Sequence, residues 1–205
     1  MNQNSFIPQI ILASTSPFRK QLLEKLQLPF ETANPKLDET PLTNESVIDM
    51  VQRLSRQKAQ VVASQYPDAI VIGSDQSATF NGKAIGKPRT HANAIKQLQQ
   101  FSGHTIEFLT GLAVVKGSEI HQAIDITRVQ FRQLSDTEIE HYLRLETPYQ
   151  CAGSFKSEGL GITLFEEIQS KDPNALIGLP LIELTTLLKK CGIALPYNYK
   201  HSRPT

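Results

Sequence analysis

Short apolar runs alternate with amphipathic stripes along most of this chain. Apolar runs of about four residues between polar turns predict buried strands, and apolar residues spaced three or four apart predict helices. Strands are predicted over residues 9–13, 30–33, 69–72, 77–80, 83–85 and 162–168, with two longer runs between 105 and 134. Helices are predicted to begin near residues 16, 44, 90, 135 and 180. Since helices and strands interleave but some strands form hairpins, we expect an α/β fold with α+β character, built on a mixed, twisted sheet.

Turn and capping signals mark several of these boundaries. Ser16-Pro17 has the residue types of an N-cap and a first helical position, and Ser135–Glu138 has the spacing of a capping box. Asn81-Gly82 is a strong signal for a hairpin turn. The apolar run at residues 69–72 leads directly into Gly73–Gln76, so Asp75 is predicted to lie where a buried strand ends.

The composition is that of one ordinary globular domain. Of the 205 residues, 40% are hydrophobic and 20% are charged, and no internal repeat, linker or charge block divides the chain. We therefore expect a single domain over residues 1–205, with two lobes around a cleft and flexible tails at 1–8 and 198–205. The formal net charge of +1 argues against nucleic acid or an anionic membrane as a partner.

The cysteines and the N-terminal region favour a cytoplasmic location. Cys151 and Cys191 form no CxxC pair and lack metal-ligand spacing. Two thiols in a cysteine-poor chain fit a reducing compartment, although a disulfide between them stays open as an alternative. The apolar run Ile10–Ala13 is too short for a signal peptide or a membrane span.

The polar segment Ser14–Arg19 follows the first predicted strand, where ligands usually bind in folds of sheets and helices. Free backbone N–H groups at the helix start can bind phosphate oxygens, and so can the hydroxyls of Ser14 and Ser16 and the guanidinium of Arg19. Ser-Pro also begins many helices, and an arginine in the first turn is usually solvated. By spacing alone, an ordinary helix start is slightly favoured.

Charged residues in other loops add to this set. Asp75, at the rim of a core, must be paired, hydrated or metal-bound, although aspartate is also a common cap. Lys87, between Gly86 and Pro88, is either a rigid positive charge in a binding site or an ordinary surface lysine. Asp38-Glu39 can join Asp75 as oxygen ligands for Mg²⁺ or Mn²⁺, but alone would be a solvated pair. Together these groups suit phosphoryl-transfer or pyrophosphohydrolase chemistry, without a Walker A or GxGxxG loop.

A series of short motifs extends from about Ile10 to Ile193. They are Ala13–Arg19 with Leu22-Leu23, Asp38-Glu39, Arg53-x4-Lys58-Ala59, Gly73–Gln76, Gly86–Pro88, Ser102-Gly103, Thr110-Gly111 and Gly178–Pro180. In this order the motifs resemble those of the Maf family of nucleoside triphosphate pyrophosphatases. Several ordered motifs at compatible separations are far more specific than any one of them.

The resemblance implies hydrolysis of a nucleoside triphosphate to the monophosphate and pyrophosphate. It also implies a divalent cation (Mg²⁺, Mn²⁺ or Co²⁺), a cleft between two lobes of an elongated sheet, and often a homodimer. By position, Asp75 corresponds to the family's proton acceptor for the attacking water and, with Glu39, to its metal site. The phosphate-binding set by position is Ser14, Arg19, Lys58 and Lys87, to which Ser16 is added from its place in the turn.

Three positions differ from the better-known dTTP/UTP-type members. Phe18 stands where those have arginine, Gln76 where they have threonine, and Glu158 near a position where they have glutamine. All three are similar to the subgroup that prefers 7-methyl-GTP. An aromatic face attracts the positive charge of N7-methylguanine, a carboxylate can accept its N–H groups, and Gln76 can add an amide contact. The simpler alternative is that Phe18 packs under the helix and Glu158 is solvated.

Two other functions stay open. One is a dTTP/UTP-type pyrophosphatase, and the other is a non-catalytic nucleotide sensor that regulates division. The acidic set around Asp75 weighs against a sensor, because a sensor needs no base for an attacking water. A small nucleotide is the expected partner in every case, since the chain lacks the aromatic-rich basic strands typical of nucleic-acid binding.

Overall fold

Strands and helices alternate along residues 8–196, the part of the chain described in the computed structural model. The strands are β1 (Ile10–Leu12), β2 (Glu31–Thr32), β3 (Ile70–Phe80), β4 (Lys83–Ile85), β5 (Thr105–Lys116), β6 (Glu119–Phe131) and β7 (Phe165–Gln169). The helices are α1 (Pro17–Glu24), α2 (Val47–Ala63), α3 (His91–Phe101), α4 (Asp136–Glu146) and α5 (Leu181–Lys190), with 3₁₀ turns η1 (Ala152–Ser154) and η2 (Leu160–Leu164). The tails expected at 1–8 and 198–205 lie outside the described residues, apart from Pro8.

One seven-stranded sheet connects all of these elements. Its order is β2-β1-β3-β5-β6-β7, with β4 paired to β3. β1 runs parallel to β2 and β3, whereas the other pairings are antiparallel. The predicted mixed sheet is therefore confirmed.

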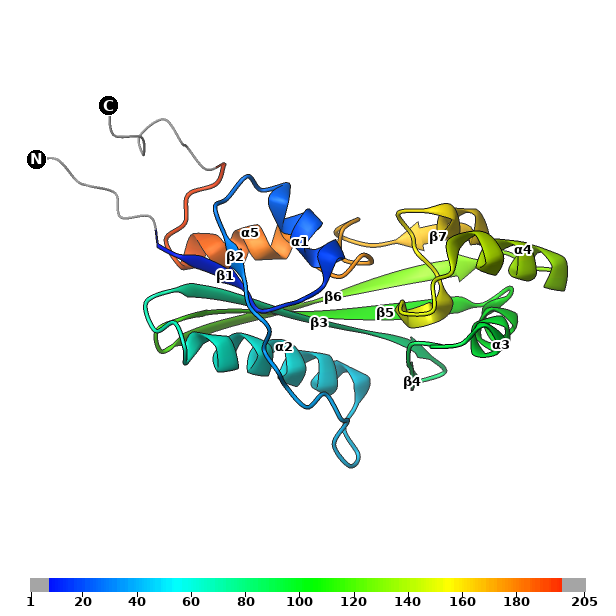
Figure 1. Cartoon of the computed structure of the whole chain (residues 1–205), viewed down its shortest axis with the longest axis horizontal. Helices are drawn as coiled ribbons and strands as arrows, with labels where there is room; N and C mark the ends of the chain where they lie inside the picture. The colour runs from blue at the N-terminus through cyan, green and yellow to red at the C-terminus, as the bar shows by residue number, and fades with distance from the viewer. Residues whose placement is uncertain (1–7, 197–205) are drawn as a thin grey trace, which may run out of the picture.

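The long strands β3, β5 and β6 extend along the molecule and carry helices on both faces (Figure 1). At one end, α2 packs on one face of the sheet, and α1 and α5 cover the opposite face. At the other end, α3 packs against α4, near β4 and β7. The sheet is thus elongated, with two groups of helices separated along its length.

Buried apolar side chains form separate clusters at the two ends of the sheet. Under α1 and α5 the cluster includes Ile72, Leu112 and Leu184, and at the far end another includes Phe101 and Phe131. Smaller clusters lie between α2 and the sheet. β3 and β5 contribute to the clusters at both ends, so one set of strands supports both.

Strand β3 is longer than the apolar run predicts. The sequence places a strand end before Gly73–Gln76, but the strand continues to Phe80 and pairs with β5 from Ile70↔Lys116 to Thr79↔Glu107. The prediction that Asp75 lies at a strand end is therefore wrong, because Asp75 is in the middle of β3. Long-range pairing with β5 outweighs the weak strand propensity of glycine and aspartate.

The last strand begins later than predicted, at Phe165 instead of residue 162. The N–H of Gly161 donates to the carbonyl of Lys156 at 3.0 Å, and this turn leads into η2. Local signals elsewhere are confirmed. Ser135 and Glu138 form the expected capping box of α4, and Asn81-Gly82 joins β3 to β4.

Candidate active site

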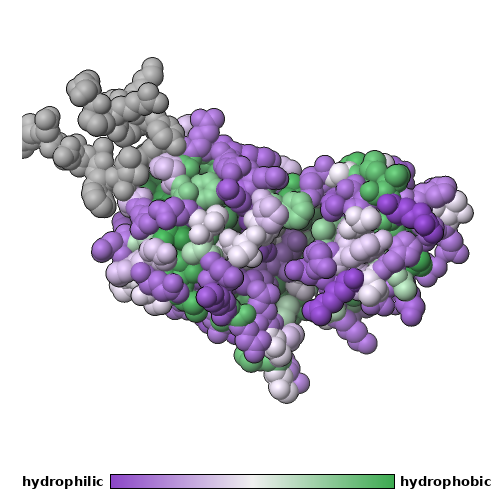
Figure 2. Space-filling model, viewed as in Figure 1, coloured by the Kyte–Doolittle hydropathy of each residue, from purple (hydrophilic) through white to green (hydrophobic). Residues whose placement is uncertain are grey.

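Two adjoining cavities open along the cleft at the centre of the molecule (Figure 2). The larger, of about 530 Å³, lies over the middle of β3, and the smaller, of about 170 Å³, extends toward η1. Ten of the eleven candidate residues from the sequence line one or both cavities, and Asp38 lines neither. Ser14, Glu39, Lys58 and Asp75 line only the larger one, Glu158 only the smaller one, and Ser16, Phe18, Arg19, Gln76 and Lys87 line both.

The ammonium group of Lys58 joins the two carboxylates of the larger cavity. Its Nζ lies 2.7 Å from Oδ1 of Asp75 and 2.6 Å from Oε1 of Glu39. Lys58 and Asp75 are buried, whereas 56% of the Glu39 side chain is exposed. Because buried charges are stable only when paired, loss of Lys58 would leave the Asp75 carboxylate uncompensated, whereas loss of Asp75 would leave Lys58 paired with Glu39.

Two glycines allow α2 to bring Lys58 this close to the sheet. A Cβ atom on Gly73 would lie 2.2 Å from the carbonyl oxygen of Ser55, and one on Gly111 would lie 2.3 Å from that of Val51. Gly111 is also the cross-strand partner of Asp75. The helix therefore packs backbone against backbone at the level of the catalytic candidate.

The loop that carries Glu39 is tied to α2 by Arg53. Arg53 donates to both carboxylate oxygens of Glu45, at 2.5 and 2.7 Å, and to the carbonyl of Thr40 at 3.3 Å. The hydrogen bonds from Arg53 lower the pKa of Glu45 to about 2. Asp38 accepts from the N–H and hydroxyl of Thr40, so it closes its own turn. Glu39 is thus the acid of this pair that reaches the site.

The hydroxyl oxygens of the first loop shape the turn into α1. Ser14 Oγ accepts from the N–H of Ser16 at 3.1 Å, and Ser16 Oγ accepts from the N–H of Arg19 at 3.4 Å, as an N-cap. Both hydroxyls still carry a proton that can be donated into the cavity. The expected arrangement of a strand end facing a helix start is confirmed for this loop.

Arg19 is braced from the opposite wall. Its Nε donates to the carbonyl of Gly178 at 2.9 Å, and the same carbonyl accepts from the hydroxyl of Ser74 at 2.9 Å. Burial lowers the pKa of Arg19, while the nearby carboxylates of Asp75 and Glu39 oppose that shift. The remaining guanidinium nitrogens are left to bind an anion in the cavity.

Lys87 lies on a loop anchored to α3. Gln97 donates to the carbonyl of Gly86 at 2.9 Å, and Asn93 donates to the carbonyl of Pro88 at 3.0 Å. The side chain of Lys87 is exposed and lines both cavities. A fixed backbone with an exposed ammonium group suits contact with a solvent-accessible phosphate.

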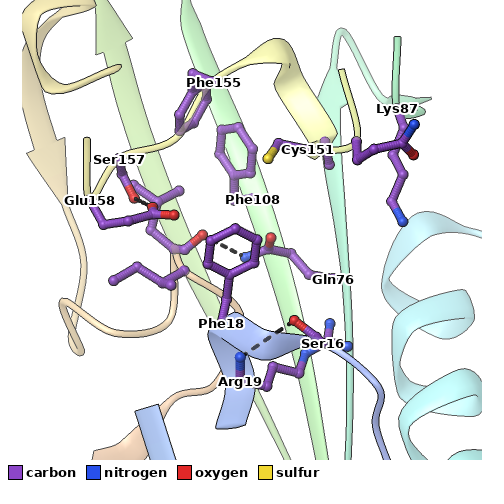
Figure 3. Close-up of a pocket in the computed structure, with 14 residues that line it drawn as sticks. Ser16, Phe18, Arg19, Gln76, Lys87, Phe108, Cys151, Phe155, Ser157 and Glu158 are labelled. Atoms are coloured by element: carbon purple, nitrogen blue, oxygen red, sulfur yellow. Dashed lines mark hydrogen bonds between the residues drawn. The ribbon is translucent and has the colours of Figure 1, made fainter. Parts of the chain in front are cut away.

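The smaller cavity has an aromatic and acidic lining. Figure 3 shows the ring of Phe18 projecting from α1 into it, and Glu158 belongs to the opposite loop. The edge-to-face pair Phe108 and Phe155, with ring centroids 5.2 Å apart, forms its inner wall. Burial raises the pKa of the Cys151 thiol in the same wall, which favours the neutral thiol over the thiolate.

Gln76 has a structural role, whereas the sequence suggests a contact with the base. Its Nε2 donates to the carbonyls of Ala175 and Leu176, at 2.9 and 3.0 Å, and approaches Thr110 Oγ1 at 3.1 Å. The amide N–H groups therefore hold the 175–176 segment against the sheet. Only the side-chain oxygen is left for a ligand.

The candidate metal ligands suit an ion that the substrate helps to bind. Across residues 8–196 no cluster of three or more His, Cys, Asp or Glu side chains is arranged to hold a metal. Glu39 and Asp75 each use one oxygen on Lys58, which leaves one oxygen apiece. Mg²⁺ is commonly bound by one or two carboxylates together with waters and substrate phosphates, so the donor set fits such an ion.

The site geometry agrees with the wider similarity of the chain. The family model for Maf-like proteins matches residues 9–191. The chain belongs to the Maf family. It is 63% identical over 199 residues to a Hydrogenovibrio crunogenus protein named 7-methyl-GTP pyrophosphatase, covering 96% of this chain and 100% of the relative. A Nitrosococcus oceani protein of the same name is 51% identical over 187 residues, covering 90% of this chain and 94% of that relative.

Solved structures share the fold of this Maf chain at low sequence identity. A Ham1 protein from Staphylococcus aureus has a TM-score of 0.52 at 11% identity, covering 90% of this chain and 100% of that one. A HAM1 protein from Coxiella burnetii has a TM-score of 0.51 at 12% identity, covering 89% and 99%. Among residues 8–196 no helix is both long and apolar enough to cross a membrane.

Several lining residues of the Maf cleft were not predicted. Phe108 and Phe155 are buried apolar residues, which a sequence alone assigns to the hydrophobic core. Their position across the cleft from Phe18 also makes them part of the cavity lining. Lys36 and Gln150 also line the larger cavity. For Lys36 the sequence offers one indication of a place in the site: it lies three residues before Glu39 in a polar loop.

Proposed function

We propose that this Maf-family chain hydrolyses a nucleoside triphosphate to the nucleoside monophosphate and pyrophosphate, with 7-methyl-GTP preferred. The observation that carries the proposal is the buried carboxylate of Asp75 in a cavity lined by Arg19, Lys58 and Lys87. Cationic side chains around a buried carboxylate suit a polyanion that must be attacked by water. The names of the two relatives support the same reaction.

In the proposed reaction, a water oxygen bonds to the α-phosphorus, and the bond from that phosphorus to the oxygen bridging to the β-phosphate breaks. Pyrophosphate leaves with the electron pair, and Asp75 accepts a proton from the water. Oδ1 of Asp75 is bound to Lys58, so Oδ2 remains to accept the proton and, together with Glu39, would also hold the divalent ion. Arg19 and Lys87 hold phosphate oxygens in line, and Lys58 fixes the orientation of Asp75.

Glu39 and Asp75 are the proposed ligands for Mg²⁺, Mn²⁺ or Co²⁺. A divalent ion supplies Lewis-acid stabilisation of negative phosphoryl oxygens. Dialysis against a chelator should abolish pyrophosphate release, and each of the three ions should be tested for recovery. Full turnover in the chelator-treated protein would remove the metal from the proposal.

The smaller cavity is the proposed site for the base. The face of Phe18 can stack on the positively charged N7-methylguanine ring, and Glu158 can accept its N1–H and exocyclic amine. The side-chain oxygen of Gln76 can accept one further hydrogen bond. dTTP and UTP lack both the ring charge and that pair of donors, so they should be poorer substrates.

Asp75→Asn is the direct test of the reaction. Loss of the proton acceptor should lower turnover by about two to four orders of magnitude while nucleotide binding persists. The assay is pyrophosphate release with 7-methyl-GTP, and a melting curve shows that the variant is folded. Near-normal turnover would make the assignment of Asp75 wrong. Nucleotide binding by the native chain with no pyrophosphate release from any triphosphate would favour the sensor.

Phe18→Ala combined with Glu158→Gln tests the choice of base. Turnover of 7-methyl-GTP should fall by about tenfold or more, since each contact contributes about 1 kcal/mol. Turnover of dTTP and UTP should change little. Parallel losses for all three nucleotides would show that these two residues do not select the base.

We also propose a cytoplasmic location and a homodimer. The thiols of Cys151 and Cys191 are both free, as a reducing compartment would keep them. The homodimer rests on the family resemblance. Light scattering of the purified chain measures its mass in solution, and a monomer at micromolar concentration would contradict that part.

A further inference from the structure

The larger cavity extends away from the base site toward the loop at residues 34–37. The residues that line only this cavity include Asp75, Lys58, Lys36 and Asn34. If the base lies in the smaller cavity and the α-phosphate lies at Asp75, the β- and γ-phosphates extend toward this loop. This step rests on the proposed function.

Lys58 is already committed at that end of the cavity. Its single positive charge lies between the carboxylates of Asp75 and Glu39, so the three groups together carry a net negative charge. The triphosphate tail is itself strongly anionic. The divalent ion proposed at Glu39 and Asp75 would offset part of this charge, and a further cation where the last two phosphates lie would add to their binding.

Lys36 is placed to supply that charge. Its side chain is exposed, lines the larger cavity and forms no ion pair within residues 8–196. Its backbone is held in the left-handed region, at φ 43°, and its N–H donates to the side chain of Asn34 at 2.9 Å. Pro35 is buried, and Leu37 packs against the apolar cluster under α2, so both neighbours of Lys36 are anchored. Uncommon backbone conformations held by their surroundings are frequent at functional sites.

We propose that Lys36 binds the terminal phosphates of the substrate and the departing pyrophosphate. When the bond between the α-phosphorus and the bridging oxygen breaks, the electron pair stays on that oxygen and pyrophosphate gains negative charge. The ammonium of Lys36 stabilises this charge without transferring a proton. Lys36 thus contributes to binding of the leaving group, while Asp75 acts on the water.

The test compares Lys36→Gln with Lys36→Arg and with Lys96→Gln. Lys96 is an exposed lysine of α3 that lines neither cavity of the cleft, so it matches the charge change away from the site. Inhibition by inorganic pyrophosphate should weaken about tenfold in Lys36→Gln, since a hydrogen bond to a charged group is worth about 1.5 kcal/mol. Inhibition by 7-methyl-GMP should change less than twofold. Lys36→Arg should retain most of the pyrophosphate binding, and Lys96→Gln should behave as the native chain.

Three results would overturn the assignment. They are unchanged pyrophosphate inhibition in Lys36→Gln, equal weakening for pyrophosphate and 7-methyl-GMP, and the same effect in Lys96→Gln. Calorimetric titration of inorganic pyrophosphate into the native and variant proteins needs no turnover. It therefore separates failure of the Lys36 assignment from failure of the proposed hydrolysis, which the native chain alone decides.

Discussion

Gly73→Ala should disable the site without touching any group that contacts the substrate. The added Cβ would lie 2.2 Å from the carbonyl oxygen of Ser55 and 2.8 Å from the amide nitrogen of Ala59. Both are backbone atoms of α2, so no side-chain rotation can relieve the clash. The helix must move away from the sheet, and it takes Lys58 with it.

The size of the effect follows from the same contacts. To restore an ordinary contact of 3.4 Å, this part of α2 would have to retreat by about 1.2 Å. A misplacement of about 1 Å in a catalytic arrangement can cost about 100-fold in rate. Overpacking of this kind also costs about 1–3 kcal/mol of stability. We therefore expect kcat to fall about 100-fold, together with a lower Tm.

A second glycine separates loss of stability from loss of geometry. Gly117, in the turn between β5 and β6, has φ 56° and open space around its Cβ position. Gly117→Ala should cost about 1 kcal/mol through backbone strain but leave Lys58 in place. Pyrophosphate release and Tm are measured for both variants. If Gly73→Ala is folded and its kcat is within twofold of the native value, the close approach of α2 does not set the position of Lys58.

Two further predictions concern pH. Arg53 lowers the pKa of Glu45 from 4.5 to about 2, so the Glu45–Arg53 pair stabilises the fold above pH 4.5 and loses this effect as the pH falls toward 2. Glu45→Gln should therefore lower Tm at pH 7, and the difference in Tm between variant and native chain should disappear between pH 4.5 and 2. Burial, aided by the charge of Asp172, raises the pKa of Asp125, so its charged form destabilises the fold as the pH rises through that pKa. Asp125→Asn should therefore gain Tm relative to the native chain as the pH rises above 3.8, and a constant difference would contradict the shift.

Local chemistry made part of the fold predictable. The capping box at Ser135 and the turn at Asn81-Gly82 depend on neighbouring residues alone, and both were placed correctly. The continuation of β3 through Gly73–Gln76 depends on pairing with β5, almost forty residues away in sequence. Gly, Ser and Asp in a row resemble a turn until that partner strand is known.

The candidate site divides in the same way. Motifs with distinctive residue types identified Asp75 and the loop before α1, and the structure brings them to one cavity. The bridge from Lys58 to Glu39 spans a long loop whose path no spacing rule gives. The aromatic wall at Phe108 and Phe155 carries no chemical signal in sequence, because these residues are also ordinary parts of the apolar core.

The long strands have a consequence for how this protein can change. β3, β5 and β6 all pass from one apolar cluster to the other, so neither half of the molecule can unfold or be deleted without unfolding the other half. Unfolding should therefore be a single cooperative event, and the paired strands β3 and β5 around Asp75 should be among the last parts to open. The start of α1 and the loop that carries Glu158 do not extend through both apolar clusters. If the proposed base site is right, substitutions at Phe18, at the start of α1, or near Glu158 would change the preferred base and leave the strands that carry Asp75 intact. One scaffold could then diversify its substrates at little cost to its fold.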